Sequence, residues 1–137
     1  MKDILQNSYD NQPSPEVLIG KVITAATFGG EAQVTIQTLD GAYMFDHDDN
    51  CCESCDLLDA SKLPLLLGKV LGVTGEQNNN LPIPPFDCES TILDYMDSYT
   101  QTIITFDIEG VGPVTLRWLG KSNGYYSELV GFWEKTA

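Results

Sequence analysis

Stretches of alternating polar and apolar residues, separated by glycine-containing turns, are the feature that most limits what this sequence can fold into. Residues 31–39 alternate with the two-residue period of a strand that buries one face, and residues 99–108 follow the same period. Asp40 and Gly41 separate the first stretch from an apolar stretch at 42–45, and Asp-Gly is a strong signal for a tight hairpin. The pattern therefore predicts antiparallel strands joined by short turns.

Weaker signals extend this pattern along the chain. Further strands are expected within residues 17–28, 69–73, 114–118 and 125–133. One short helix is expected in the segment that Ser61 would cap and Gly68 would end. With about six or seven strands and one short helix, the predicted fold is mainly β with a minor α component. It would be a single antiparallel curled sheet, or a small sandwich or barrel.

The domain organisation is predicted from chain length and from the positions of the prolines. A chain of 137 residues is long enough for one domain with its own core. Residues 1–16 are polar and proline-containing, which predicts a flexible N-terminal tail, and residues 17–137 are expected to form a single β-rich domain. Residues 75–90 are rich in asparagine and proline and are expected to form a long loop. Neither a membrane-spanning run nor a signal peptide is recognised, so we expect an intracellular protein.

The excess of acidic residues argues against some classes of partner. The chain has 20 Asp and Glu residues against 7 Lys and Arg residues, a formal net charge of −13. No base occurs between Lys21 and Lys62, or between Lys69 and Arg117. Such a surface repels phosphate backbones and anionic membranes, so direct binding to nucleic acid or membrane is not expected. It would complement a basic protein surface, although the acidity could also serve solubility alone.

An acidic, cysteine-rich stretch at residues 46–56 (DHDDNCCESCD) is the first candidate site. It holds the only histidine of the chain and three of its four cysteines, which we expect to be reduced in a cytoplasmic protein. A zinc site is one interpretation, because the Cys-x-x-Cys spacing suits a tetrahedral ion. The second paired element of most zinc modules is missing, however. The ligands would come from His47, Cys52, Cys55 and Cys88.

Two other interpretations of this stretch remain open. A metal-dependent hydrolase could be built on His47, Asp48, Asp49 and Cys51, although a single histidine is few for a catalytic metal. The simpler interpretation is that the cysteines are buried as small apolar residues and the neighbouring acids are solvated.

The second candidate site is residues 117–128 (RWLGKSNGYYSE). Arg117 and Lys121 are the only bases between Lys69 and Lys135. An arginine beside aromatic rings can hold a carboxylate or phosphate while the rings stack on a flat ligand. The alternative is a hairpin in which Arg117 pairs with the acids of the first site and the aromatic side chains pack within the sheet.

These two stretches resemble the signatures of a family of small bacteriophage and prophage proteins known only as a domain of unknown function. Residues 47–54 (HDDNCCES) are similar to its His-Asp-Gln-Asp-Cys-Cys-Glu motif, and residues 116–128 (LRWLGKSNGYYSE) are similar to its second motif. Shorter matches occur at 18–21 and 97–100, so the resemblance covers roughly residues 17–132 in the same order. Cys55 stands outside the family motif, which argues against zinc. The resemblance implies a phage origin and a small accessory role.

The expected function is that of an acidic phage accessory protein in the host cytoplasm, which binds and inhibits a host or antiviral-defence protein with a basic surface. A protein that sequesters a small ligand or nucleotide is the alternative, and a metal-dependent hydrolase is a third. We expect binding rather than catalysis and assign no catalytic residue. No cofactor other than zinc is expected. The sequence leaves open whether the chain forms a homo-oligomer. The residues expected to bind the partner or ligand are His47, Asp48, Asp49, Glu53, Arg117, Trp118, Asn123, Tyr125 and Tyr126. Their use depends on one geometric prediction: the two stretches should meet across one sheet, with Arg117 near the acids around His47.

Overall fold

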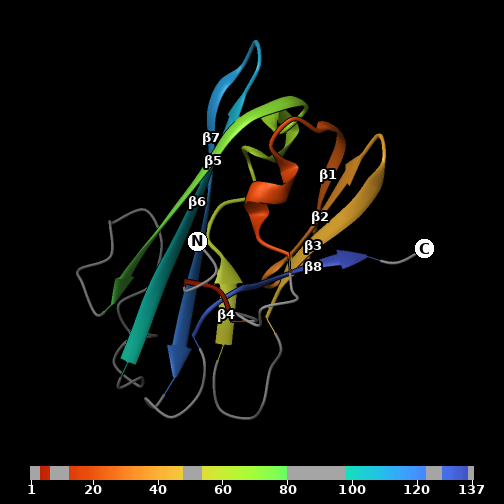
Figure 1. The fold of residues 1–137 in the computed structure, drawn as a ribbon. Coiled ribbons are helices and arrows are strands. Elements are labelled where there is room, and N and C mark those ends of the chain that lie inside the picture. Colours follow the sequence, from red (N-terminus) through yellow and green to blue (C-terminus); the bar gives the residue numbers. More distant parts are fainter. Residues whose placement is uncertain (1–3, 7–12, 48–53, 80–97, 123–127, 136–137) are drawn as a thin grey trace.

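A computed structural model describes residues 4–6, 13–47, 54–79, 98–122 and 128–135 of the chain. Within these residues, eight strands form one antiparallel sheet in the order β4-β7-β6-β5-β1-β2-β3-β8 (Figure 1). The prediction of a mainly β, curled antiparallel sheet is therefore confirmed. The strands are β1 (Val22–Gly30), β2 (Gln33–Thr38), β3 (Gly41–Asp46), β4 (Ser54–Leu57), β5 (Gly68–Asn79), β6 (Ser98–Ile108), β7 (Gly112–Ser122) and β8 (Gly131–Lys135).

The predicted short helix is shorter and tighter than expected. It is the 3-10 helix η3 (Leu63–Leu65), and a second 3-10 helix, η2 (Pro15–Leu18), precedes β1. The residues described contain no α-helix, and none of the helices there is long and apolar enough to cross a membrane. Ser61 does not cap η3: its N–H donates to Asp59 Oδ1 at 2.8 Å, and the N-cap residue is Lys62. Because η3 has only three residues, it forms one tight 3-10 turn and no α-helical turn.

The long loop predicted at 75–90 begins later than expected. Residues 75–79 continue β5 and pair with β6 as far as Asn79 opposite Thr100. Asparagine and glutamate disfavour strands only weakly, and pairing with a long neighbouring strand outweighs that preference. The rest of this stretch lies outside the residues described.

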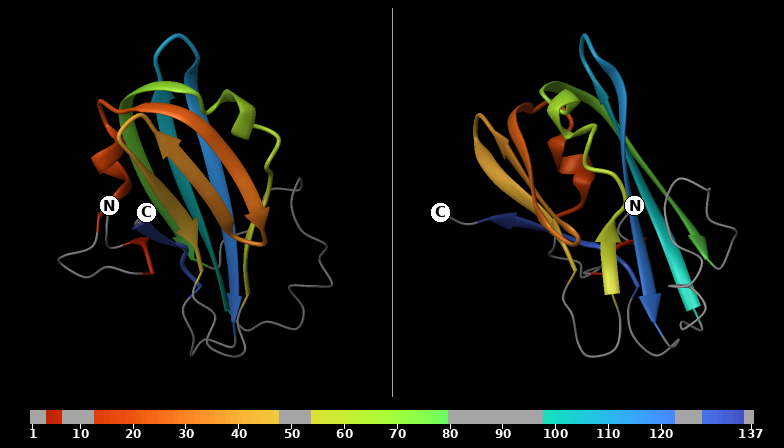
Figure 2. Two further views of the ribbon diagram at one scale, coloured as in Figure 1. Left: turned by 90° about the vertical axis from the view of Figure 1, so that its right-hand side faces the viewer. Right: turned by 180° about the vertical axis from the view of Figure 1, so that it is seen from behind.

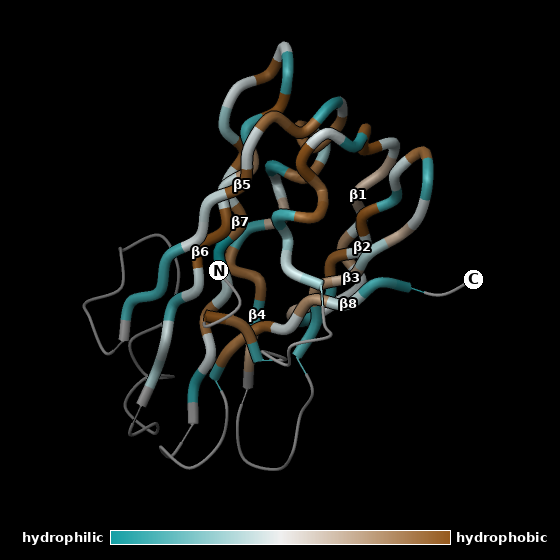
Figure 3. The backbone as a smooth tube through the Cα atoms, in the orientation of Figure 1, coloured by the Kyte–Doolittle hydropathy of each residue, from teal (hydrophilic) through white to brown (hydrophobic). Residues whose placement is uncertain are grey.

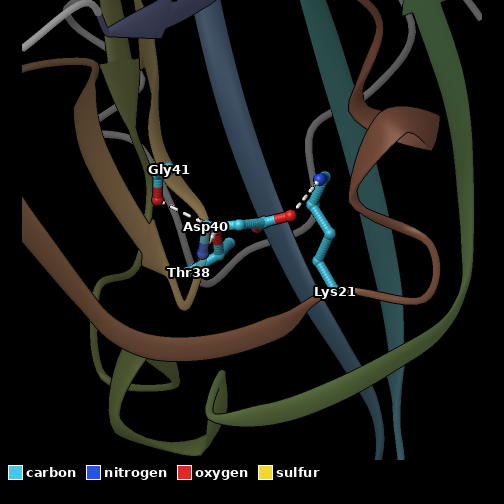
Figure 4. Close-up of polar contacts among 4 residues, drawn as sticks. All are labelled: Lys21, Thr38, Asp40 and Gly41. Carbon is cyan, nitrogen blue, oxygen red and sulfur yellow. Dashed lines mark hydrogen bonds and ion pairs between the residues drawn. The ribbon is translucent and has the colours of Figure 1, made fainter.

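The predicted hairpin is confirmed by the pairing of β2 and β3, but its turn residues are Leu39 and Asp40, one position earlier than the predicted Asp40 and Gly41. Thr38 pairs with Gly41, so the turn between the strands contains two residues. The Thr38 hydroxyl lies 2.9 Å from both Asp40 Oδ1 and the Gly41 carbonyl oxygen (Figure 4). Lys21 Nζ, at the entry to β1, donates to Asp40 Oδ2 at 2.9 Å and ties this turn to the neighbouring strand.

The sheet folds over so that its two halves face each other, as the side views show (Figure 2). The halves are β4-β7-β6-β5 and β1-β2-β3-β8, and only two residue pairs join β1 to β5, Val22 with Lys69 and Ile23 with Gly68. Apolar residues on the facing sides form the core, visible as the brown stretches of the strands in Figure 3.

Aromatic rings fill the middle of this core. The ring of Phe45 lies 4.8 Å from that of Trp118 and 4.8 Å from that of Phe132, centroid to centroid. Trp118 Nε1 donates to the carbonyl oxygen of Ala32 on the opposite half at 2.9 Å, which satisfies its one polar group. Trp118 therefore connects the two halves both by packing and by a hydrogen bond.

Part of the predicted N-terminal tail is docked on this core. Leu5 is buried with the core residues, and the Gln6 N–H donates to the Val130 carbonyl oxygen at 2.9 Å. Pro15, the first residue of η2, is also buried. Burial of Leu5 removes apolar surface from water, which holds these described residues against the domain.

Candidate functional site

The two candidate stretches of the sequence meet on one sheet, as predicted. β4, the end of the first stretch, pairs with β7 of the second, with Ser54 opposite Lys121 and Cys55 opposite Gly120. Close to this contact, His47 Nδ1 lies 2.8 Å from the Leu129 carbonyl oxygen. Because a carbonyl oxygen only accepts, His47 Nδ1 carries the proton, and Nε2 is the basic nitrogen of the neutral ring.

Gly120 lies at the centre of the contact. Across the strands it has Cys55 of β4 on one side and Thr100 of β6 on the other. A Cβ atom at Gly120 would lie only 1.8 Å from the Glu128 carbonyl oxygen. Glycine is therefore required here, because the backbone of Glu128 occupies the space where a side chain would be.

Glu128 brings a carboxylate into this buried position. Its side chain is 8 % exposed, and Glu128 Oε1 accepts a hydrogen bond of 2.7 Å from the Thr100 hydroxyl. Burying a carboxylate is costly unless it is hydrogen-bonded, and bonds to an ionised acceptor are among the stronger ones. We call the buried residues gathered here the Glu128 cluster: His47, Cys55, Thr100, Gly120 and Glu128.

Two buried polar groups beside the cluster have no hydrogen-bond partner among the residues that the structure describes. Thr102 lies two residues after Thr100 on the same face of β6 and is fully buried, yet its hydroxyl is unpaired. Gln101 points to the opposite face, is also buried, and leaves its side-chain NH₂ unpaired. Unpaired buried polar groups cost stability, so their concentration on one strand marks this end of the sheet as atypical of a core.

The Glu128 cluster contains an imidazole, a thiol and a carboxylate. Among the residues that the structure describes, no three His, Cys, Asp or Glu side chains are close enough to hold a metal ion. Two of the four zinc ligands considered, Cys52 and Cys88, lie outside those residues, as does Cys51 of the hydrolase interpretation. His47 and Cys55 are both buried.

The remaining predicted site residues are divided between the core and the surface. Trp118 is fully buried in the aromatic core, where its ring packs against Phe45 rather than facing solvent. Arg117, next along β7, faces the other side of the sheet and is half-buried. Arg117 was predicted to lie near the acids around His47, and of these Asp48, Asp49 and Glu53 lie outside the residues described. Asn123, Tyr125 and Tyr126 also lie outside them.

Arg117 lines a pocket of about 380 Å³ between β7 and the segment that contains η3. Figure 2 shows this segment running beside β7. Lys62 and Asp59 of the same segment also line the pocket, and neither was singled out in the sequence. Its other lining residues are Leu58, Leu65, Pro113, Val114 and Thr115.

The sequence carried a signal for part of what was missed. In the alternation of β6, Thr100 and Thr102 occupy positions equivalent to the apolar Ile104, Phe106 and Ile108 on the inner face. Polar residues at two successive core positions indicate a buried polar site. Glu128 belonged to the second stretch but could not be distinguished there from a solvated acid.

Comparison with known proteins identifies the family but no relative of known structure. The family model described as a domain of unknown function (DUF7448) matches residues 16–132, a range that includes both candidate stretches. Neither a search of curated proteins nor a search of solved structures gives a match. The match covers most of the chain, which therefore belongs to the DUF7448 family.

Proposed function

We propose that this chain is a phage-encoded accessory protein that acts in the host cytoplasm by binding and inhibiting a host or antiviral-defence protein. The partner would present a basic, nucleic-acid-binding surface. The observation that carries the proposal is a set of exposed carboxylates without ion-pair partners on one side of the sheet.

Three acids make up this set, which we call the acidic face. Glu76 of β5 and Asp107 of β6 point outward from the same side of the sheet, as the register of the two strands requires. Glu109 follows in the turn at the end of β6. All three are exposed, and none forms an ion pair within the part of the chain that the structure describes.

Unpaired carboxylates on a strand-built surface suit recognition of a basic partner. The net charge of −13 adds a long-range field of the same sign, which speeds encounter with a cationic surface and repels nucleic acid. Thr74 and Thr105, which are paired across β5 and β6, lie between Glu76 and Asp107 and supply hydroxyl groups for hydrogen bonds. The acidic face would compete with nucleic acid for the basic surface of the partner. A partner bound here could therefore not bind its nucleic acid.

The test is capture of partners by the tagged chain from host lysate at low salt, followed by binding measurements with the purified partner. We expect a basic nucleic-acid-binding protein whose affinity falls as salt rises and which duplex DNA or RNA displaces. The triple variant E76Q/D107N/E109Q should slow association about tenfold. If no basic protein is retained at low salt, the proposal is wrong.

A matched control removes the same charge elsewhere. The variant E16Q/E31Q/E134Q neutralises three exposed acids that lie outside the acidic face, in η2, in the turn after β1 and in β8. This control variant should retain most of the affinity for the partner. Equal losses in both triple variants would show that net charge alone attracts the partner and that the acidic face is not the binding surface.

A further inference from the structure

We propose that the pocket between β7 and the η3 segment binds a small molecule that bears one carboxylate on a compact apolar body. This site is separate from the acidic face, and the inference does not depend on the proposed function. The pocket volume of about 380 Å³ falls at the low end of the range of small-molecule sites, about 300–1,000 Å³.

The pocket exists because β4 covers only part of the edge of β7. β4 pairs with β7 from Trp118 to Lys121, and at Leu58 the chain leaves the strand. The Leu58 N–H still donates to the Arg117 carbonyl oxygen at 2.9 Å, which fixes the lower end of the pocket. Beyond this bond the segment turns through η3, and a hollow remains against β7.

Positive charge is concentrated at this pocket although bases are scarce in the chain. Arg117 and Lys62 are two of only seven Lys and Arg residues, and both line it. Among the described residues that line the pocket, Asp59 is the one acid, and it is held by its own turn. The Ser61 N–H donates to its carboxylate at 2.8 Å, and this bond lowers the pKa of Asp59, with a smaller contribution from Lys62. The formal charge of the lining is therefore +1.

A monocarboxylate matches this charge and this shape. The guanidinium of Arg117 has five N–H donors in a planar fork, so it can bind a carboxylate while keeping other contacts. Leu58, Leu65 and Pro113 provide apolar walls, and Leu65 is 47 % exposed, so an apolar body would cover it from water. A dianionic phosphate would leave one negative charge uncompensated, in a chain that is already strongly acidic.

The experiment is titration of the full chain with benzoate, with benzamide and inorganic phosphate in parallel, followed by backbone amide NMR and calorimetry. We expect millimolar benzoate to shift the amides of Lys62, Thr115 and Arg117 at concentrations where benzamide and phosphate do not. The variant R117Q should weaken benzoate binding about tenfold, and K62Q should weaken it less. K69Q, which removes an exposed base outside the pocket, should leave binding unchanged.

Several results would overturn the inference. The inference is wrong if benzoate causes no amide shifts at the pocket. It is also wrong if benzamide binds as tightly as benzoate. Phosphate binding more tightly than benzoate would contradict the assignment to a monocarboxylate. If R117Q proves unfolded, K62Q decides the question, because Lys62 is exposed and has no role in the core; unchanged affinity in K62Q would then exclude the pocket.

Discussion

The inner face of β6 and β7 carries two regions of opposite chemistry. In one, Ile104, Phe106, Leu116 and Trp118 are fully buried among apolar neighbours. In the other, a few residues along the same strands, Thr100 lies opposite Gly120 and donates to the carboxylate of Glu128, and Thr102 follows on the same face of β6. Both regions are buried, but only the first gains stability from every side chain it buries.

This difference separates a region that only stabilises the domain from a region whose side chains need particular partners. Apolar packing is non-directional and tolerates exchange of similar volumes, whereas each buried polar group requires a particular partner. The Glu128 cluster includes His47 and Glu128, one from each candidate stretch, and it neighbours the Thr102 hydroxyl, which has no hydrogen-bond partner among the residues described. A region that gives up stability in this way is expected where a protein has a task besides folding.

The strongest test of the apolar region is Trp118→Ala. The substitution removes the ring that packs on Phe45 and the hydrogen bond to Ala32, so we expect a loss of about 3–5 kcal/mol in the free energy of unfolding. Denaturant titration measures it. Trp118→Phe, which keeps most of the packing and loses the N–H donor, should lose about 1–2 kcal/mol. A loss in the alanine variant no greater than in the phenylalanine variant would contradict a packing role for this ring.

In the polar region, Gly120→Ala should have the largest effect. The new methyl group would meet the Glu128 carbonyl oxygen, so the backbone must move and the bond between Glu128 and Thr100 is strained, with an expected loss of about 2–3 kcal/mol. Gly72→Ala on β5 is the control, because nothing lies nearer than 4.0 Å to the added atom. Thermal and denaturant unfolding of the two variants should differ clearly. Equal stabilities would mean that the close approach to Glu128 is not rigid.

Thr100→Val and Thr102→Val should have different effects although the change is the same. Thr100→Val removes the donor to a buried carboxylate and should cost about 1–3 kcal/mol, whereas Thr102→Val removes a hydroxyl without a partner and should be neutral or stabilising. The pair is best measured as a difference in denaturant midpoint. If Thr102→Val destabilises as much as Thr100→Val, the Thr102 hydroxyl has a partner after all.

The smallest effect is expected from an exposed carboxylate, Asp40, in contrast to the buried one. Its hydrogen bonds with Lys21 and then Thr38 lower the pKa of Asp40 below its ordinary value of 3.8. Its contribution to stability is therefore complete above pH 3.8 and is lost as the pH falls through the lower pKa of the folded state. In the Asp40→Asn variant, the free energy of unfolding should therefore fall slightly less steeply as the pH is lowered. Denaturant unfolding at a series of acidic pH values measures this dependence. The same dependence of stability on acidic pH in both proteins would show that the ion pair contributes nothing to stability.

Local sequence was a sufficient guide where strand alternation and turn chemistry agreed. The hairpin around Asp40 and Gly41 was predicted to within one residue, because its alternation and its turn both depend on neighbours in sequence. The length of β5 was underestimated because residues 75–79 pair with β6, some twenty residues later along the chain. The 3-10 geometry of η3 was also missed, since a serine followed by an apolar stretch and a glycine does not distinguish one 3-10 turn from a short α-helix.

The sequence by itself determined a β-rich domain, one of its hairpins, a strongly acidic composition and the two candidate stretches. Only the tertiary structure placed Thr100, Gly120 and Glu128 together, buried Trp118 in the core and set Arg117 beside Lys62 in a pocket. The physical reason is that alternation along a strand specifies which side chains share a face. Which strand, loop or carboxylate lies opposite that face depends on pairings between residues far apart in the chain.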